Sequence, residues 1–253
     1  MSANGFFAAA NGNLFVGKNV TTFYQGNPQD WDSKAAAYHS DLTWESPTVV
    51  RVMTWMKQLF PEEDVRHFAL KYVASLLGLF PVDKHIVILQ GGCSSGKTTF
   101  VELLRTVLGS RCFRVHRDYM KPQLLGYRSQ HDKISPSHTV AIIEDMARPL
   151  QESEARRLVE SSITENRNLI ICATELSEVI ASTSRLDLVI LPIKSTYYCS
   201  FDAETPDNHY PQDPRFYDYL DDLAPAMLWI MCQYYPTFRD EGLVPTESMT
   251  ALI

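Results

Sequence analysis

The strongest chemical signal in the sequence is a glycine-rich segment in the first half of the chain. It reads Gly91-Gly92-Cys93-Ser94-Ser95-Gly96-Lys97-Thr98, with Thr99 next, and matches the pattern G-x-x-x-x-G-K-[ST]. An apolar run precedes it and a helix-like stretch follows, which is the context that a phosphate-binding loop requires. Glycines let backbone N–H groups surround a phosphate, and the N-terminus of the next helix adds positive charge. We therefore expect residues 91–99 to bind ATP, with Lys97 on its β- and γ-phosphates and Thr98 holding Mg²⁺.

Two adjacent acids form the second candidate group. Glu144 and Asp145 end the apolar run from Thr139 to Ile143. A carboxylate at such a strand end, beside the phosphate loop, can bind Mg²⁺ through water while its neighbour polarises the attacking water. We expect Glu144 to be a metal ligand and both acids to be catalytic. The alternative is a strand that simply ends at two solvated acids.

The elements that must position these residues are short apolar strands alternating with helices. Continuous apolar strands of this kind indicate an α/β fold with a mainly parallel sheet covered on both faces. The strands are expected at residues 85–89, 139–143, 168–172 and 187–191. Apolar spacing and proline positions predict helices at residues 49–60, 62–77, 98–108 and 151–165, and two more, 214–223 and 225–235, split at Pro225.

Composition and charge divide the chain into three expected segments. Residues 1–60 look irregular apart from their last helix, residues 61–194 form the ATPase core with its leading helix, and residues 195–253 form an acidic, helical C-terminal segment. That last segment holds ten acidic residues against two basic ones, whereas the whole chain has a net charge of −7. A basic stretch, residues 111–133, has six Lys and Arg against two Asp.

Several classes of protein are excluded by the same numbers. With 45% hydrophobic residues the chain can build a core, and no apolar stretch reaches the roughly 18 residues of a membrane span. The five cysteines are scattered without ligand spacing, which argues against a zinc site or a disulfide framework. We expect no membrane partner and an intracellular location.

The ordered set of motifs resembles the ATPase domain of superfamily 3 viral helicases, an AAA+-like family, and is most similar to the poxvirus and giant-virus primase-helicase type. An amphipathic helix ending at Gly78 precedes the strand and loop, and the helix after the loop ends at Leu108-Gly109. The family's third motif, approximately Thr-Asn-Glu-Leu-Pro-Glu, is matched by residues 173–178, Ala-Thr-Glu-Leu-Ser-Glu. Arg185 then precedes a short strand that ends at Pro192. The resemblance runs from about Trp44 to the end of the chain.

This resemblance implies a ring of subunits, a hexamer, with ATP bound between neighbours and Arg185 reaching the neighbour's γ-phosphate. Thr174 takes the sensor position that orients water. The implied partners are single-stranded nucleic acid, DNA in preference to RNA, and a primase or other replication protein. A viral origin would place the protein in the host cytoplasm or nucleus.

Two departures from the family pattern matter for function. The sensor residue is normally Asn, and Thr174 has a shorter side chain with one donor. Only 29 positions separate Asp145 from Thr174, which leaves little room for a loop that contacts DNA. The basic stretch, with Tyr119 or Tyr127 for stacking, can supply such contacts instead, although charged loops between strands explain it equally well.

The function predicted from the sequence is an ATP-dependent helicase or translocase of superfamily 3 type, acting in the replication of viral or mobile-element DNA. The alternative is a catalytically weakened ring ATPase that serves as a nucleotide-bound scaffold or loader. A small-molecule kinase with a phosphate loop is disfavoured, because the C-terminal segment is acidic rather than arginine-rich.

Overall fold

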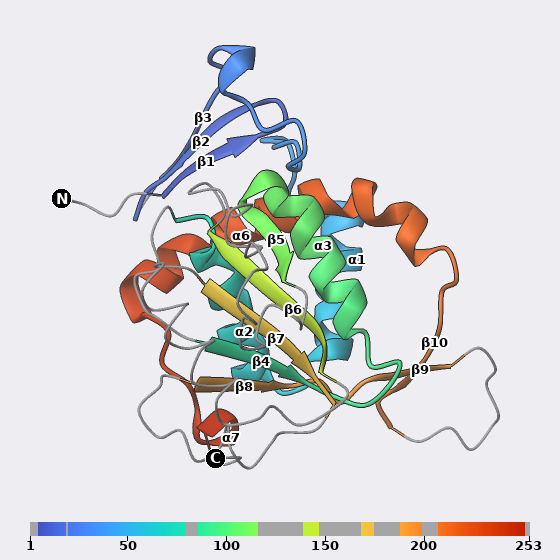
Figure 1. Cartoon of the computed structure of the whole chain (residues 1–253). Helices are drawn as coiled ribbons and strands as arrows, with labels where there is room; N and C mark the ends of the chain where they lie inside the picture. Colours follow the sequence, from blue (N-terminus) through green and yellow to red (C-terminus); the bar gives the residue numbers. More distant parts are fainter. Residues whose placement is uncertain are drawn as a thin grey trace, which may run out of the picture.

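The chain forms a parallel sheet flanked by helices, with a small antiparallel sheet at one end (Figure 1). The computed structural model describes residues 5–18, 20–78, 86–115, 139–146, 168–174, 188–198 and 207–250. The main sheet has five strands, and every neighbouring pair is parallel. In spatial order they are β5 (Cys112–Val115), β6 (Val140–Met146), β7 (Asn168–Ala173), β4 (Ile86–Gln90) and β8 (Leu188–Pro192). The expected α/β class with a mainly parallel sheet is confirmed.

The strands β4, β6, β7 and β8 are buried on both faces of the sheet, which explains their long apolar runs, whereas the edge strand β5 carries the exposed Arg114. On β4, Val87 and Leu89 belong to the main core cluster, while Ile88 between them points to the other face and is also fully buried. On β6, Ile142 and Ile143 are related in the same way. Successive side chains of a strand point to opposite faces, so a strand buried on both sides has no polar alternation.

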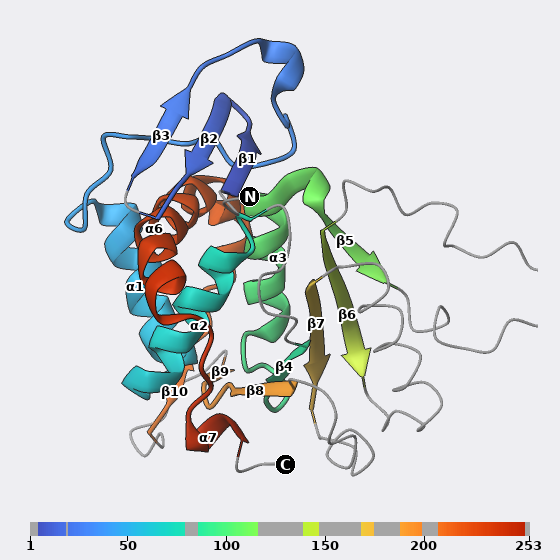
Figure 2. The same ribbon diagram turned by 90° about the vertical axis from the view of Figure 1, so that its left-hand side faces the viewer.

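Four helices pack together on one side of the sheet, as Figure 2 shows: α1 (Pro47–Leu59), α2 (Glu63–Ser75), α3 (Lys97–Leu108) and α6 (Leu220–Glu241). The helix α6 contacts the other three. A short helix, α7 (Glu247–Thr250), contacts β8. Among the described residues, no helix is both long and apolar enough to cross a bilayer. Residues of all three expected segments share one apolar core, and the division at residues 60 and 194 stays a prediction.

The expectation of two C-terminal helices split at Pro225 is wrong. A single turn of 3₁₀ helix, η5 (Phe216–Tyr219), leads into α6, which continues through both Pro225 and Pro236. A proline inside a helix removes one backbone hydrogen bond and crowds the preceding turn. Because twelve of the 22 residues of α6 are buried, the packing of its apolar face outweighs that local loss.

Residues 5–24 form a three-stranded antiparallel sheet rather than the irregular chain expected from their glycines and asparagines. The strands are β1 (Gly5–Ala9), β2 (Gly12–Val16) and β3 (Thr21–Tyr24). Ala10 and Asn11 form the turn between the first two strands, so the polar residues that looked like loop are a hairpin turn. Phe7 and Leu14 are fully buried, whereas Phe6 and Phe15 on the opposite face are 45% and 36% exposed.

The segment after this small sheet is attached to the C-terminal end of α3. The Asp32 carboxylate accepts hydrogen bonds from the Ser110 N–H (2.7 Å) and hydroxyl (3.0 Å) in the 3₁₀ turn η2 (Gly109–Arg111). The Ala36 N–H donates to the Val107 carbonyl at 3.2 Å. Since α3 has 12 residues, about 18 Å at 1.5 Å per residue, residues 32–36 lie far from the helix start where chemistry is expected.

Candidate functional site

The glycine loop (residues 91–96) connects the carboxyl end of β4 to the first turn of α3. The neighbouring strands hold its beginning from both sides. The Gly91 N–H donates to the Ala173 carbonyl of β7 at 3.2 Å, and the Ile193 N–H, just beyond β8, donates to the Gln90 carbonyl at 2.7 Å. The loop therefore lies at the carboxyl edge of a central parallel strand, where ligands bind in open α/β sheets.

Sterically, the structure requires glycine at the two fixed positions of the motif. Gly96 has φ +94°, and a Cβ added there would meet Leu59 Cδ2 at 2.8 Å. A Cβ at Gly91 would meet the backbone oxygen of Ile193, also at 2.8 Å. At Gly92, which occupies a variable motif position, no atom of the described residues lies within 4 Å of an added Cβ. The two motif glycines are therefore needed for the shape of the loop, and Gly92 is not.

Residues that follow β8 fix the other half of the loop. The Ser195 hydroxyl donates to the Ser95 carbonyl at 2.8 Å, and both serines are buried. The Tyr197 N–H donates to the carbonyl of Ser94, a non-glycine residue held at φ +56°. Sequence reasoning missed Ser195 and Tyr197, because they lie about a hundred positions downstream of the loop with no motif around them.

The Lys97 side chain folds back into the glycine loop. Its ammonium group donates to the carbonyl oxygens of Gly91 (2.5 Å) and Gly92 (2.7 Å) and lies 3.2 Å from Ser95 Oγ. Burial lowers the pKa of Lys97 below its ordinary value. The cation is thus placed inside the loop, held by acceptors that phosphate oxygens could replace.

Thr98 and Thr99 belong to the first turn of α3, where the helix presents the positive end of its dipole. Gly96 is the N-cap, and no side chain of the described residues caps the helix there. Thr98 is exposed, while the Thr99 hydroxyl lies 3.4 Å from the hydroxyl of Tyr217 in η5. An anion at this helix end would meet backbone N–H groups and the Thr98 hydroxyl together.

Glu144 lies farther from the loop than the sequence suggested, because β7 separates its strand from β4. Two strand spacings correspond to about 10 Å. Arg114 Nε lies 3.1 Å from Glu144 Oε1, and Arg114 also pairs with Glu102, which in turn pairs with Arg105 at 2.6 Å. Glu144 Oε1 is buried and forms no hydrogen bond of good geometry with any described residue. This carboxylate therefore has a cationic neighbour but retains acceptor capacity.

The Cys172 thiol is buried on the intervening strand β7, between the strands that carry the glycine loop and Glu144. Its pKa is raised to about 12, mainly by burial; the Glu144 carboxylate contributes to the increase, and the Lys97 ammonium opposes it. One buried group thus interacts with both charges. Cys172 therefore lies between the loop lysine and the strand-end acid, on the strand that separates their elements.

Thr174 is the predicted site residue that the sheet register brings next to the loop. It directly follows Ala173, which pairs with Gln90 and accepts the Gly91 N–H, and its side chain is exposed. Arg185 and the Asp145 side chain lie outside the described residues, as do the expected helix 151–165 and most of the basic stretch.

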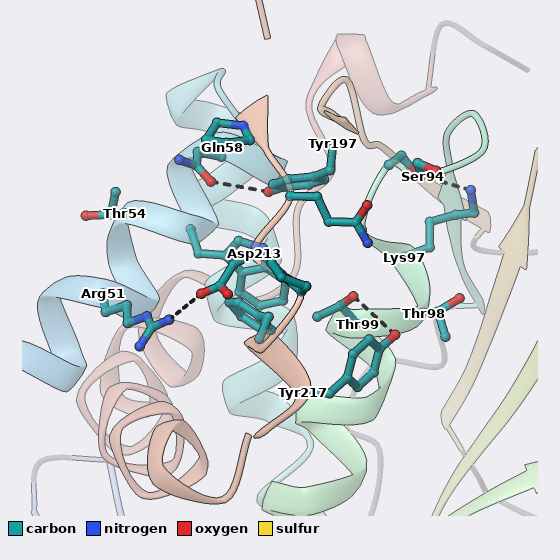
Figure 3. A pocket seen from close by; sticks show the side chains of 17 residues that line it. Arg51, Thr54, Gln58, Ser94, Lys97, Thr98, Thr99, Tyr197, Asp213 and Tyr217 are labelled. Atoms are coloured by element: carbon teal, nitrogen blue, oxygen red, sulfur yellow. Dashed lines mark hydrogen bonds and ion pairs between the residues drawn. The ribbon is translucent and has the colours of Figure 1, made fainter. Parts of the chain in front are cut away.

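A cavity of about 500 Å³ opens beside the loop (Figure 3). Its walls come from three separate parts of the chain: the α1 residues Arg51, Thr54, Trp55 and Gln58; loop and α3 residues 94–99; and Tyr197 with most of residues 211–217. The contributions of α1 and of 211–217 were not predicted. Neither segment carries a motif, and only packing brings them to the loop.

Comparisons with known proteins show a limited likeness. No protein family matches the sequence, and no curated protein matches it. The solved structures that match this chain include three of the C-terminal region of NrS-1 without ligand. The first has a TM-score of 0.49 and 9% identity over 92% of this chain and 68% of that one. The others have TM-scores of 0.48, with 11% identity over 98% and 68% and 10% identity over 99% and 71% of the two chains. At these values the likeness carries nothing about activity, ligand or partner, and membership of superfamily 3 stays a prediction from the motifs.

Proposed function

We propose that this protein is a Mg²⁺-dependent ATPase that binds the phosphates of ATP at the glycine loop. The observation that carries the proposal is the position of Lys97, whose ammonium lies inside a sterically constrained loop at the N-terminus of α3. Helix dipole, backbone N–H groups and a lysine together form a site for a polyphosphate.

Two described residues fit the expected metal. The Thr98 hydroxyl is exposed at the helix start, and Glu144 has a buried oxygen without a hydrogen bond to any described residue. Mg²⁺ is usually held by one or two protein oxygens together with substrate phosphates, so this pair would suffice. When bound, the ion would neutralise charge that develops on the phosphate oxygens.

The remaining predicted residues have roles that follow from their placement. The Lys97 ammonium would neutralise the β- and γ-phosphates, donating to phosphate oxygens in place of the loop carbonyl oxygens. Glu144 and Asp145 would orient and polarise the attacking water, with Thr174 as a hydroxyl donor beside the loop. Arg185 would act from a neighbouring subunit, as the resemblance implies, adding positive charge where the transition state builds negative charge.

The motor role rests on the motif set. In this proposal the chain assembles as a hexameric ring that moves along single-stranded DNA during viral or mobile-element replication, together with a primase or other replication partner. A second candidate is a weakened ring ATPase that acts as a scaffold or loader. Thr174 in place of Asn and the ion pair between Arg114 and Glu144 favour this second reading, because both weaken the groups that would activate water.

The test is the steady-state ATPase rate with and without single-stranded DNA or RNA. Lys97→Ala is expected to lower the rate roughly 10²–10³-fold, the loss seen when one preorganised transition-state donor is removed. Lys34→Ala is the matched control, an exposed lysine in the N-terminal segment. Turnover stimulated by polynucleotide supports the motor. ATP binding with negligible turnover supports the scaffold, and ATP binding unaffected by Lys97→Ala would overturn both.

A further inference from the structure

The cavity beside the glycine loop is larger than a phosphate site needs and is built from elements outside the motif. We propose that it is the nucleoside subsite, which takes the base and ribose of the bound nucleotide, with C-terminal residues 211–217 as one wall. This inference rests on the proposed function, in which the glycine loop binds the phosphates of the nucleotide. It adds that the acidic C-terminal segment is part of the nucleotide site.

The two ends of the cavity differ in chemistry. One end is the start of α3, with Lys97 and the helix dipole, which favours phosphate. The other walls carry four aromatic rings, contributed by α1, by the strand β9 (Thr196–Tyr198) and by η5: Trp55, Tyr197, Phe216 and Tyr217. A ligand that satisfies both ends has a phosphate group joined to a flat aromatic ring. Nucleotides have this form, whereas sugar phosphates and inorganic polyphosphates lack the ring.

The size and polar groups of the cavity agree with this ligand. A volume of about 500 Å³ lies within the range of small-molecule sites, roughly 300–1,000 Å³. The Gln58 amide lines the wall, and its oxygen lies 3.3 Å from the Tyr197 hydroxyl, which orients it. An amide offers both donors and an acceptor, the groups needed to read the edge of a base.

Contacts on both sides of the cavity attach the C-terminal wall to the rest of the site. Figure 3 shows the ion pair between Arg51 of α1 and Asp213, at 3.0 Å, and the pairing of Thr99 with Tyr217. The Arg51 guanidinium also lies 4.3 Å from the centre of the Tyr219 ring. The ion pair is between exposed groups and contributes little alone. A base lying against Tyr217 would add a contact between the C-terminal segment and the loop.

The experiment compares two probes, ADP and inorganic pyrophosphate, by isothermal titration calorimetry. The variant is Tyr217→Ala, and the control is Tyr198→Ala, because these tyrosines are similarly exposed (53% and 45%) and Tyr198 does not line the cavity. Loss of one aromatic–base contact is expected to weaken ADP about 5- to 150-fold. Pyrophosphate affinity should be unchanged. Tyr217→Phe, which keeps the ring but not the hydroxyl, should bind ADP within about threefold of the unmodified protein.

Each other outcome overturns a defined part of the reasoning. Equal weakening of ADP and pyrophosphate by Tyr217→Ala would mean that the substitution perturbs the loop, and the nucleoside subsite would be wrong. Unchanged ADP affinity would also refute it, as would equal weakening by Tyr198→Ala. Lys97→Ala separates this from the proposed function: if it weakens both probes, the phosphate site stands whatever Tyr217 shows, and if it weakens neither, the proposed function fails.

Discussion

The glycine loop contains three glycines, and replacing each with alanine tests whether its structure is the one described. Gly96 and Gly91 occupy the fixed positions of the motif, and Gly92 occupies a variable one. Gly96→Ala and Gly91→Ala should destabilise the fold, whereas Gly92→Ala should not. All three add the same methyl group to neighbouring positions, so the comparison isolates backbone conformation and space.

The magnitude for Gly96→Ala has three parts. A left-handed backbone costs an alanine about 1–2 kcal/mol. The contact at 2.8 Å with Leu59 Cδ2, inside the packed core, adds an overpacking cost of about 1–3 kcal/mol. Reduced entropy of the unfolded chain returns about 0.4–1 kcal/mol. The net loss of unfolding free energy is therefore about 1–5 kcal/mol.

For Gly91→Ala the backbone conformation is acceptable, and the methyl group is opposed by the Ile193 carbonyl oxygen at 2.8 Å and by Ser95 Oγ at 2.9 Å. A backbone oxygen cannot rotate away as a side chain can, so a loss of about 1–3 kcal/mol is expected. For Gly92→Ala no described atom opposes the methyl group, and the entropy of the unfolded chain gives a gain of up to about 1 kcal/mol.

The measurement is the midpoint of thermal unfolding, followed by circular dichroism at one scan rate for all variants. In a chain of this length, 1 kcal/mol corresponds to about 2–4 °C. Gly96→Ala should therefore unfold roughly 2–20 °C below the unmodified protein, and Gly91→Ala roughly 2–12 °C below it. Gly92→Ala should unfold at or slightly above the unmodified midpoint. A fixed scan rate matters because proteins of this size often unfold irreversibly.

The reasoning would be refuted if the three variants shifted the midpoint equally, or if Gly92→Ala were the most destabilised. Equal shifts would mean that the loop does not distinguish its glycines, so that its shape would differ from the one described. If only Gly92→Ala lost stability, Gly92 rather than Gly96 would be the glycine that needs a left-handed backbone.

Three further predictions concern the helices behind the site. The pKa of the Glu241 carboxyl lies below its ordinary value of 4.5, first because of a hydrogen bond with His67 and next because of one from Lys71. The ionised Glu241 carboxylate therefore stabilises the fold above its ordinary pKa, and this stabilisation is lost as pH falls through the lower folded-state pKa. Glu241→Gln should lower the unfolding midpoint by about 1–3 °C at neutral pH, and the difference should vanish in acid. The Tyr72 hydroxyl is buried without a hydrogen-bond partner among the described residues. Tyr72→Phe should therefore raise the unfolding midpoint by about 2–8 °C. A lower midpoint would mean that the hydroxyl forms a hydrogen bond. Pro225→Ala should restore one backbone hydrogen bond in α6 and raise the free energy of unfolding, measured in urea, by about 1–3 kcal/mol. A lower free energy of unfolding would mean that the helix depends on the packing of the proline ring.

Most of the regular elements were predictable, because their signals are local. The four predicted strands of the main sheet read as short apolar runs, and their observed limits differ from the expected ones by at most three residues, whereas β5 was not predicted. The helix after the loop is bounded by Gly96 and Gly109, both with positive φ, and was placed to within one residue. The N-terminal hairpin was missed because its strands are short and because Asn11 in the turn and Gly12 at the start of β2 looked like loop.

The candidate site was predictable only in its central part. The spacing from Gly91 to Thr98 fixes a loop between a strand and a helix, so its position followed from the motif. The partners of that loop did not, because no pattern relates Ser195 or Tyr197 to it. The pairing of Arg114 with Glu144 likewise depends on β5 lying beside β6, which periodicity does not specify.

By itself, the sequence determined the loop, the alternation of strands and helices and the burial of the strands, since hydrophobic periodicity and glycine spacing act over a few residues. Only the tertiary structure decided that β7 lies between β4 and β6, that α6 runs through Pro225, and that α1 and residues 211–217 enclose a cavity beside Lys97. These arrangements depend on contacts between segments that lie far apart in the sequence, whose packing energy outweighs local preference and leaves no trace in local pattern.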